Sequence, residues 1–172
     1  MKVCSRGHKY EKLPCPKCWP SGKRKPIIAV TTMDAVIEEL VRKSDKRVLV
    51  IWARDCAKRT IPYFESQYPS DKRPNTAIHA CSKWIKDGVF RMKDIRKASL
   101  DSHAAARSAT NESARAAARS CGQAIATIHA KLHALAAARY AVSAIRDSSA
   151  SPEVASLKER NWQYKHLLKL LK

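Results

Sequence analysis

The sequence predicts an all-α protein, a multi-helix bundle with a small N-terminal zinc-binding module. Glycine is scarce, with four residues in 172, and alanine is abundant in the second half, which favours helices over sheets. Apolar residues recur at helical spacing between cap and stop residues, and no second strand pattern is present to pair with a first. We therefore expect a zinc-knuckle-like module and basic linker at residues 1–26 and a bundle of about six to eight helices at residues 27–172.

The first part of the chain carries four candidate zinc ligands, Cys4, His8, Cys15 and Cys18, in the pattern C-x3-H-x6-C-x2-C. Structural zinc sites close thiolates and imidazoles around the ion in a tetrahedron, and C-x2-C is a typical knuckle. The segment has no apolar run that could form a core, so bound zinc would supply most of its folding free energy. The alternatives are a flexible tail with free cysteines or an N-terminal disulfide.

Cap residues place the first two helices of the bundle. Threonine at 31 or 32 is expected to cap a helix that extends to Val41, and Asp45 to cap a helix over residues 46–59. The run at 48–53 contains β-branched residues that would suit a strand. Because no partner strand is present, we predict a helix there.

Proline and glycine place the boundaries that follow. Pro62 is expected to open a turn of helix that extends to about Gln67. Pro74 lies at a first-turn position of a helix that stops at Gly88. A helix over about 93–108 comes next.

The second half is dense in alanine. Asn111 or Thr110 is expected to cap the stretch 112–145, which is long for one helix, so we predict an interruption at 129–135. Ser151 and the proline after it begin the last helix. Alanine on facing helices allows the helix axes to approach closely, which predicts a tight bundle.

Charge and cysteine content restrict the partners and the compartment. The formal charge of +19, from 34 basic and 15 acidic residues, attracts polyanions such as nucleic acid or an acidic protein, although a lysine-rich surface needs no partner. Cys56, Cys81 and Cys121 lie singly in helical patterns, as buried free thiols do. No signal-peptide pattern and no transmembrane stretch is found, so we expect a cytoplasmic protein.

The order of several short stretches resembles the bacterial immunity proteins with an Imm-5-like helical domain. The stretches are WARDCAKR at 52–59, YPSDKRP at 68–74, HAAAR at 103–107, AAAR at 116–119, the residues from Gly122 to Thr127, His129, His133, Tyr140-Ala141, and ERNWQY at 159–164. The resemblance covers roughly residues 34–166. It implies a non-enzymatic interaction protein that binds and blocks a partner protein such as a toxin. The alternative is a nucleic-acid-binding accessory protein that uses the zinc module and the basic surface.

The sequence contains no pattern typical of a catalytic site. A glycine-rich phosphate loop, paired catalytic carboxylates and a nucleophile elbow are all missing from it, so we expect no enzymatic activity. His129 and His133 share a helix face at a spacing of four. The zinc-protease pattern needs a glutamate after the first histidine, and that position is Ala130.

Seven polar residues of the bundle lie in otherwise apolar or alanine-rich stretches. A lone buried charge would cost several kcal/mol, so these side chains are expected to satisfy one another. We predict that they converge in or beside one groove: Asp55, Arg59, Arg73, His103, Arg107, His129 and His133. The groove would be either a closed network that only stabilises the bundle, which is the commoner case, or an open ligand site.

The zinc module generates the first testable prediction. Protein purified without added metal should carry one structural zinc ion per chain, measured by elemental analysis, and Cys15→Ser should lower that content. Less than about 0.2 zinc per chain, unchanged in the variant, would contradict the prediction.

Overall fold

The computed structural model describes residues 2–3, 9–10 and 28–172. The predicted zinc ligands Cys4, His8, Cys15 and Cys18 lie outside the described residues, so the metal module stays a prediction. Two short strands, β1 (Lys2–Val3) and β2 (Lys9–Tyr10), pair antiparallel. Strands of two residues are too short to leave a periodic pattern in a sequence, which is why none was predicted.

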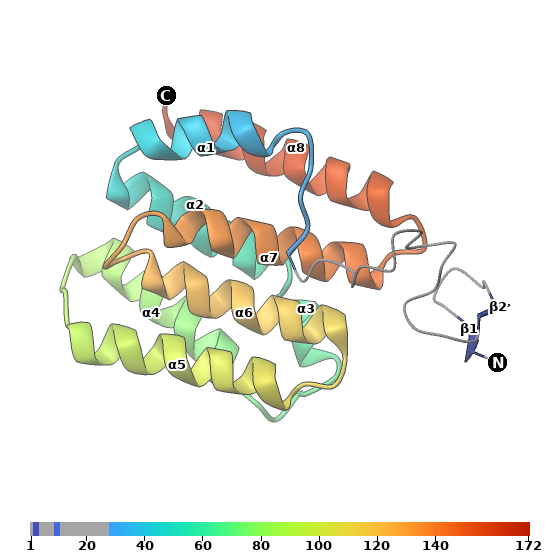
Figure 1. Ribbon diagram of the computed structural model, residues 1–172. Coiled ribbons are helices and arrows are strands. Elements are labelled where there is room, and N and C mark those ends of the chain that lie inside the picture. Colours follow the sequence, from blue (N-terminus) through green and yellow to red (C-terminus); the bar gives the residue numbers. More distant parts are fainter. Residues whose placement is uncertain (1, 4–8, 11–27) are drawn as a thin grey trace.

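Residues 28–172 form an all-α bundle, as predicted (Figure 1). The helices are α1 (Asp34–Lys43), α2 (Lys46–Lys58), α3 (Ile61–Glu65), α4 (Arg73–Asp87), α5 (Met92–Ser108), α6 (Glu112–Ala126), α7 (His133–Ser148) and α8 (Pro152–Leu170). The ambiguous run at 48–53 is helical, within α2. No helix in this part of the chain has both the length and the apolar character that a bilayer crossing requires.

The cap predictions succeed at some helix ends and fail at others. Asn111 caps α6 by accepting from the amide of Ala114 at 2.9 Å, and Gly88 ends α4 in the left-handed region with φ of 67°. Asp45 and Ser151 occupy N-cap positions without a side-chain hydrogen bond. The predicted interruption falls at residues 127–132, slightly before the expected place.

The first helix of the bundle begins later than predicted. Met33 occupies the N-cap of α1, and neither threonine caps the helix. Thr31 instead donates from its amide to the Asp34 carboxylate at 2.6 Å and from its hydroxyl at 2.9 Å. Because its amide and hydroxyl both donate to Asp34, Thr31 does not serve as the N-cap of α1.

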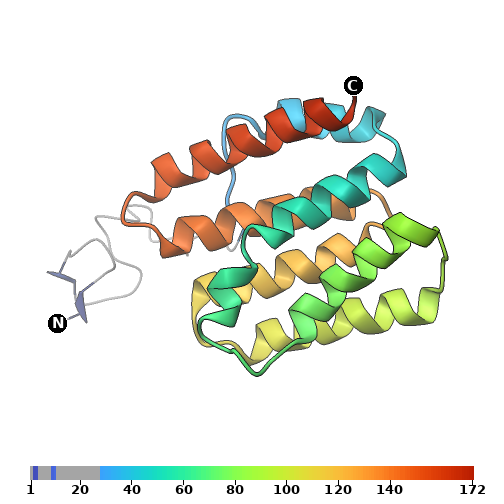
Figure 2. The ribbon, with the colours of Figure 1, turned by 180° about the vertical axis from the view of Figure 1, so that it is seen from behind.

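Helices α6 and α7 form an antiparallel hairpin at the centre of the bundle (Figures 1 and 2). Helices α3, α4 and α5 pack on α6, while α1 and α8 pack on α7. Helix α2 contacts both members of the hairpin as well as α4 and α8. The hairpin is therefore the element on which most of the fold is assembled.

Small residues let the neighbours of α6 approach it closely. Most of its side chains are alanine, serine or glycine and are buried. Serine hydroxyls cross the helix interfaces to backbone carbonyls: Ser102 to Ala118 and Ser120 to Ala137, each at 2.7 Å. Such bonds need short interaxial distances, and each contributes about 1 kcal/mol to stability. The prediction of a tight alanine-rich packing agrees with this geometry.

A buried ion network holds α1, α7 and α8 together. The Arg160 guanidinium is 1% exposed and donates to the Asp34 carboxylate at 2.6 Å and to Gln163 Oε1 at 2.6 Å. Arg139 donates to the same oxygen of Asp34 at 2.9 Å and also to Glu38. Burial by itself would raise the pKa of Asp34, but the hydrogen bonds from Arg139 and Thr31 and the charge of Arg160 lower it below the ordinary value.

Removal of the Asp34 charge should destabilise the protein strongly. Asp34→Asn leaves two arginines without their shared carboxylate, and we expect a loss of about 3–5 kcal/mol in the free energy of unfolding, measured in urea. Glu39→Gln is the control, because Glu39 forms an exposed pair with Lys43, and it should leave the unfolding midpoint unchanged.

The same variant should change the response to acid. A carboxylate whose pKa is lowered by folding contributes stability that is fully present above about pH 4 and declines as the pH falls toward the folded pKa. The stability of Asp34→Asn should therefore decline less than that of the unaltered chain over this range. Parallel acid profiles for the two proteins would contradict the assigned role of Asp34.

Candidate functional site

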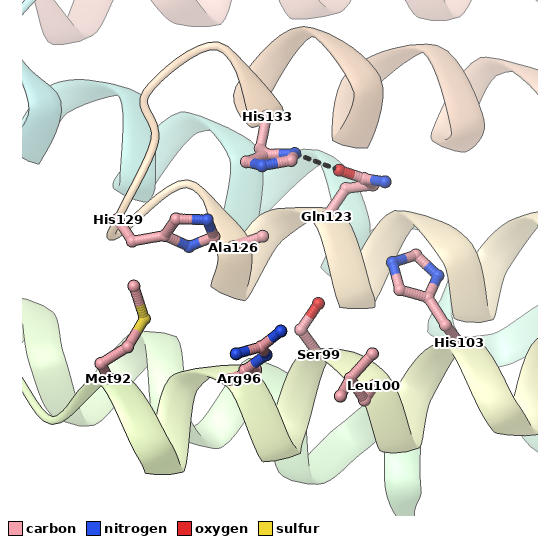
Figure 3. Close-up of a pocket in the computed structure, with 9 residues that line it drawn as sticks. All are labelled: Met92, Arg96, Ser99, Leu100, His103, Gln123, Ala126, His129 and His133. Carbon is pink, nitrogen blue, oxygen red and sulfur yellow. Dashed lines mark hydrogen bonds between the residues drawn. The ribbon is translucent and has the colours of Figure 1, made fainter.

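A groove lies between α5 and α6, beside the link from α6 to α7 (Figure 3). Its hollow has a volume of about 300 Å³. Helix α5 supplies most of the lining, α6 supplies two residues, and the link and the start of α7 each supply a histidine. The lining residues are Met92, Arg96, Ser99, Leu100, His103, Gln123, Ala126, His129 and His133.

The ring of His103 lies directly against the backbone of α6. A Cβ atom built on Gly122 would be 2.9 Å from His103 Nε2, so only glycine leaves room for the ring in this position. Ser99, one turn earlier on α5, donates to the Gly122 carbonyl at 2.9 Å. His103 Nδ1 is buried without a hydrogen-bond partner among the described residues. An orphaned buried polar atom is costly, so the position of this ring lowers the stability of the fold.

His129 and His133 face the same hollow from the other side. Their ring centroids are 5.2 Å apart, and His133 Nδ1 is 2.6 Å from Gln123 Oε1. Since an amide oxygen only accepts, the His133 Nδ1–H donates and leaves Nε2 as the unprotonated nitrogen of the neutral ring. His129 is exposed.

Both of the less exposed histidines are poor bases in this groove. Burial lowers the pKa of His103 below its ordinary value, and the charges of Arg119 and Arg107 lower it further. The pKa of His133 is lowered mainly by burial and then by His129. Both rings are therefore neutral at neutral pH, and no carboxylate lines the groove to stabilise their charged forms.

The prediction that all seven polar residues share one groove is not what the structure shows. The three histidines line one hollow, and Arg107 lies outside the lining, one helical turn beyond His103. Asp55 instead accepts from His166 of α8 at 2.9 Å. Its helix, α2, packs this residue toward α8 and away from α5.

Two of the predicted arginines likewise have partners elsewhere. Arg59 forms a salt bridge with Glu159 at 2.9 Å, and its guanidinium lies 3.9 Å above the Trp162 ring. Burial raises the pKa of Glu159, and hydrogen bonding to Arg59 only partly offsets this. Arg73 pairs locally with Asp71 at 2.6 Å. These contacts pair the charges of both arginines within the bundle without a ligand.

Sequence reasoning missed the residues that complete the groove. Arg96 and Ser99 precede His103 on α5 by seven and four positions, which places all three on one helix face. Gln123 lies on α6, and only the fold brings it to His133. The helical spacing back from His103 is the signal that could have found the first two.

Other chemistry finds little support in the described residues. They contain no group of three or more His, Cys, Asp or Glu side chains arranged to hold a metal ion. Cys56, Cys81 and Cys121 are buried free thiols, as predicted. Burial raises the pKa of Cys81 to about 12 and that of Cys121 still further, so neither is a thiolate at neutral pH.

Comparison with known proteins identifies one family. The family model described as "Imm-5 like putative immunity protein" matches residues 39–170, which include the whole groove. No curated protein matches the chain. No solved structure matches it either. The predicted zinc module lies outside the matched span.

The contact between His103 and Gly122 generates a prediction for stability. Gly122→Ala should gain helix propensity of up to about 1 kcal/mol but lose about 1–3 kcal/mol by overpacking against the ring. In a His103→Ala background the clash is removed, so the same substitution should stabilise the protein. Denaturant unfolding of the four proteins measures the coupling, and additive effects would contradict the packing described here.

Proposed function

The chain belongs to the Imm-5 like family of immunity proteins, and from this premise we propose that it is a non-enzymatic protein that binds and blocks a partner protein such as a toxin. The observation that carries the proposal is a collection of exposed apolar side chains around the groove. We call these side chains the groove rim: Val89, Phe90, Met92, Leu100 and Leu132.

The groove rim gathers at one end of the bundle. Two of its members lie in the connection from α4 to α5, two on α5, and Leu132 in the link from α6 to α7. Both connections occur at the same end in the two opposite views (Figures 1 and 2). The rim holds five of the ten large apolar side chains that are most exposed in the described part of the chain, with Phe90 at 52% and Leu100 at 55%. Clustered exposed apolar residues are typical of protein interaction sites.

Basic residues surround the rim and indicate the charge of the partner. Arg91 and Lys93 are exposed on either side of Met92 at the start of α5. An acidic face on the partner would complement them and would accelerate encounter. A toxin that carries such a face is the occupant that this surface fits best.

The proposal makes a prediction about two rim residues. Phe90→Ala with Leu100→Ala should weaken partner binding by about 30-fold or more, because truncation of two apolar interface residues removes about 2 kcal/mol or more in total. The product of a toxin gene that neighbours this gene would be the partner to test, by co-expression and growth and by binding with the purified proteins. Val154→Ala with Leu157→Ala is the matched control, since both residues are exposed and apolar but lie on α8.

The control pair should protect cells as the unaltered chain does, and the rim pair should not. Equal loss of binding in both pairs, with all proteins folded, would contradict the proposed face. The alternative of a nucleic-acid-binding accessory protein is tested on the same material: retention on DNA that falls steeply as salt rises would favour it, because phosphate contacts release counterions.

A further inference from the structure

The groove between α5 and α6 has an electrostatic character that a partner-binding rim does not explain. Its lining contains one arginine and three histidines and no carboxylate. The acidic residues of α5, Asp94 and Asp101, lie outside this lining, and Asp101 forms a salt bridge with Lys97 at 2.6 Å. Arg107 of α5 and Arg119 of α6 add positive potential at His103. The hollow therefore carries an excess of positive charge without an internal counterion.

Hydrogen-bond donors and potential donors in the hollow are left without partners. Figure 3 shows Arg96 and His103 extending from α5 toward α6, with His129 and His133 on the opposite side. Arg96 forms no hydrogen bond or ion pair within residues 28–172. His103 Nδ1 is likewise unpartnered and buried, and His133 Nε2 is left over once Nδ1 donates to Gln123. Arginine and imidazolium are the side chains that most often bind oxyanions through charge-assisted hydrogen bonds.

We propose that this groove binds an oxyanion, a phosphate or a carboxylate group, held by Arg96, His103 and His133. Arg96 provides the permanent charge and a two-pronged donor. His103 lines the hollow beside Arg96, and His133 turns Nε2 toward the ligand. Gln123 fixes the His133 ring, and Gly122 gives His103 its place against α6. Met92 and Leu100 of the groove rim also line this groove, but the anion needs no partner protein, because the isolated chain contains every group that holds it.

Binding to this site is coupled to proton uptake. In the free groove His103 and His133 are neutral, since burial and the neighbouring Arg107, Arg119 and His129 disfavour their charged forms. A bound anion supplies the missing negative charge and raises the affinity of both rings for a proton. Affinity therefore increases as the pH falls, by up to about tenfold per pH unit for each proton taken up.

Inorganic sulfate is the probe, because its charge does not change over the range from about pH 8 to pH 6 in which histidines titrate. Sulfate binding to the full chain is followed by the NMR signals of the three groove histidines, at constant ionic strength set with chloride. We expect saturable shifts of the His103 and His133 signals, with affinity that increases toward pH 6. The signal of His79, an exposed histidine of α4 outside the lining, should not move.

Two variants separate the groove from general charge attraction. Arg96→Gln should weaken sulfate binding about tenfold, the loss of one charge-assisted hydrogen-bonded contact. Lys93→Gln removes the same charge from an exposed position on the same helix outside the lining, and it should have little effect. His133→Gln should retain a partner for Gln123 but reduce the pH dependence.

Comparison of anions then identifies the source of the ligand. Tighter binding of sulfate and phosphate than of acetate assigns the groove to a phosphate group, and binding of acetate as tight as that of sulfate assigns it to a carboxylate. The proposal is overturned if none of the three anions shifts the histidine signals, or if Arg96→Gln and Lys93→Gln weaken binding equally. It is also overturned if the affinity does not depend on pH. None of these outcomes bears on whether the chain blocks a partner protein.

Discussion

The close approach of α5 and α7 to α6 is the constraint on which the rest of the structure depends. It is possible because α6 presents alanine, serine and glycine on both of its faces. Serine hydroxyls can therefore donate to backbone carbonyls across the helix interfaces. A leucine-rich α6 would hold its neighbours further away and would break these hydrogen bonds. The helices outside the hairpin can then complete the core with larger residues such as Trp52 and Leu167.

The groove follows from this packing. Since Gly122 has no side chain, the His103 ring enters the interface and loses its hydration, while its Nδ1 finds no partner among the described residues. The hollow beside it is open at the surface, where Arg96 and the rim residues stand. The close packing of the His103 ring on α6 and the unsatisfied Nδ1 beside the hollow therefore both depend on Gly122.

The elements of the bundle could be predicted from the sequence because their signals are local. Asn111 caps α6 and Gly88 ends α4 through contacts within one or two turns. The buried pair of Asp34 and Arg160 could not be predicted, because 126 positions separate the two residues. The same limit applies to the groove: helical spacing groups Arg96 with His103, but nothing in the sequence decides whether Asp55 faces this hollow or α8. Polar residues embedded in apolar helices predict that partners exist, not which ones.

The central claim is that α6 admits His103 into a desolvated, positively charged groove that contains no carboxylate. Its most direct test is the pKa of His103 in the free protein, measured by NMR in chloride solution without other anions. The account predicts a pKa below the ordinary histidine value of 6.5, since burial and the two nearby arginines act in the same direction. A pKa at or above 6.5 would contradict it, because the ring would then be hydrated or paired with an acidic group.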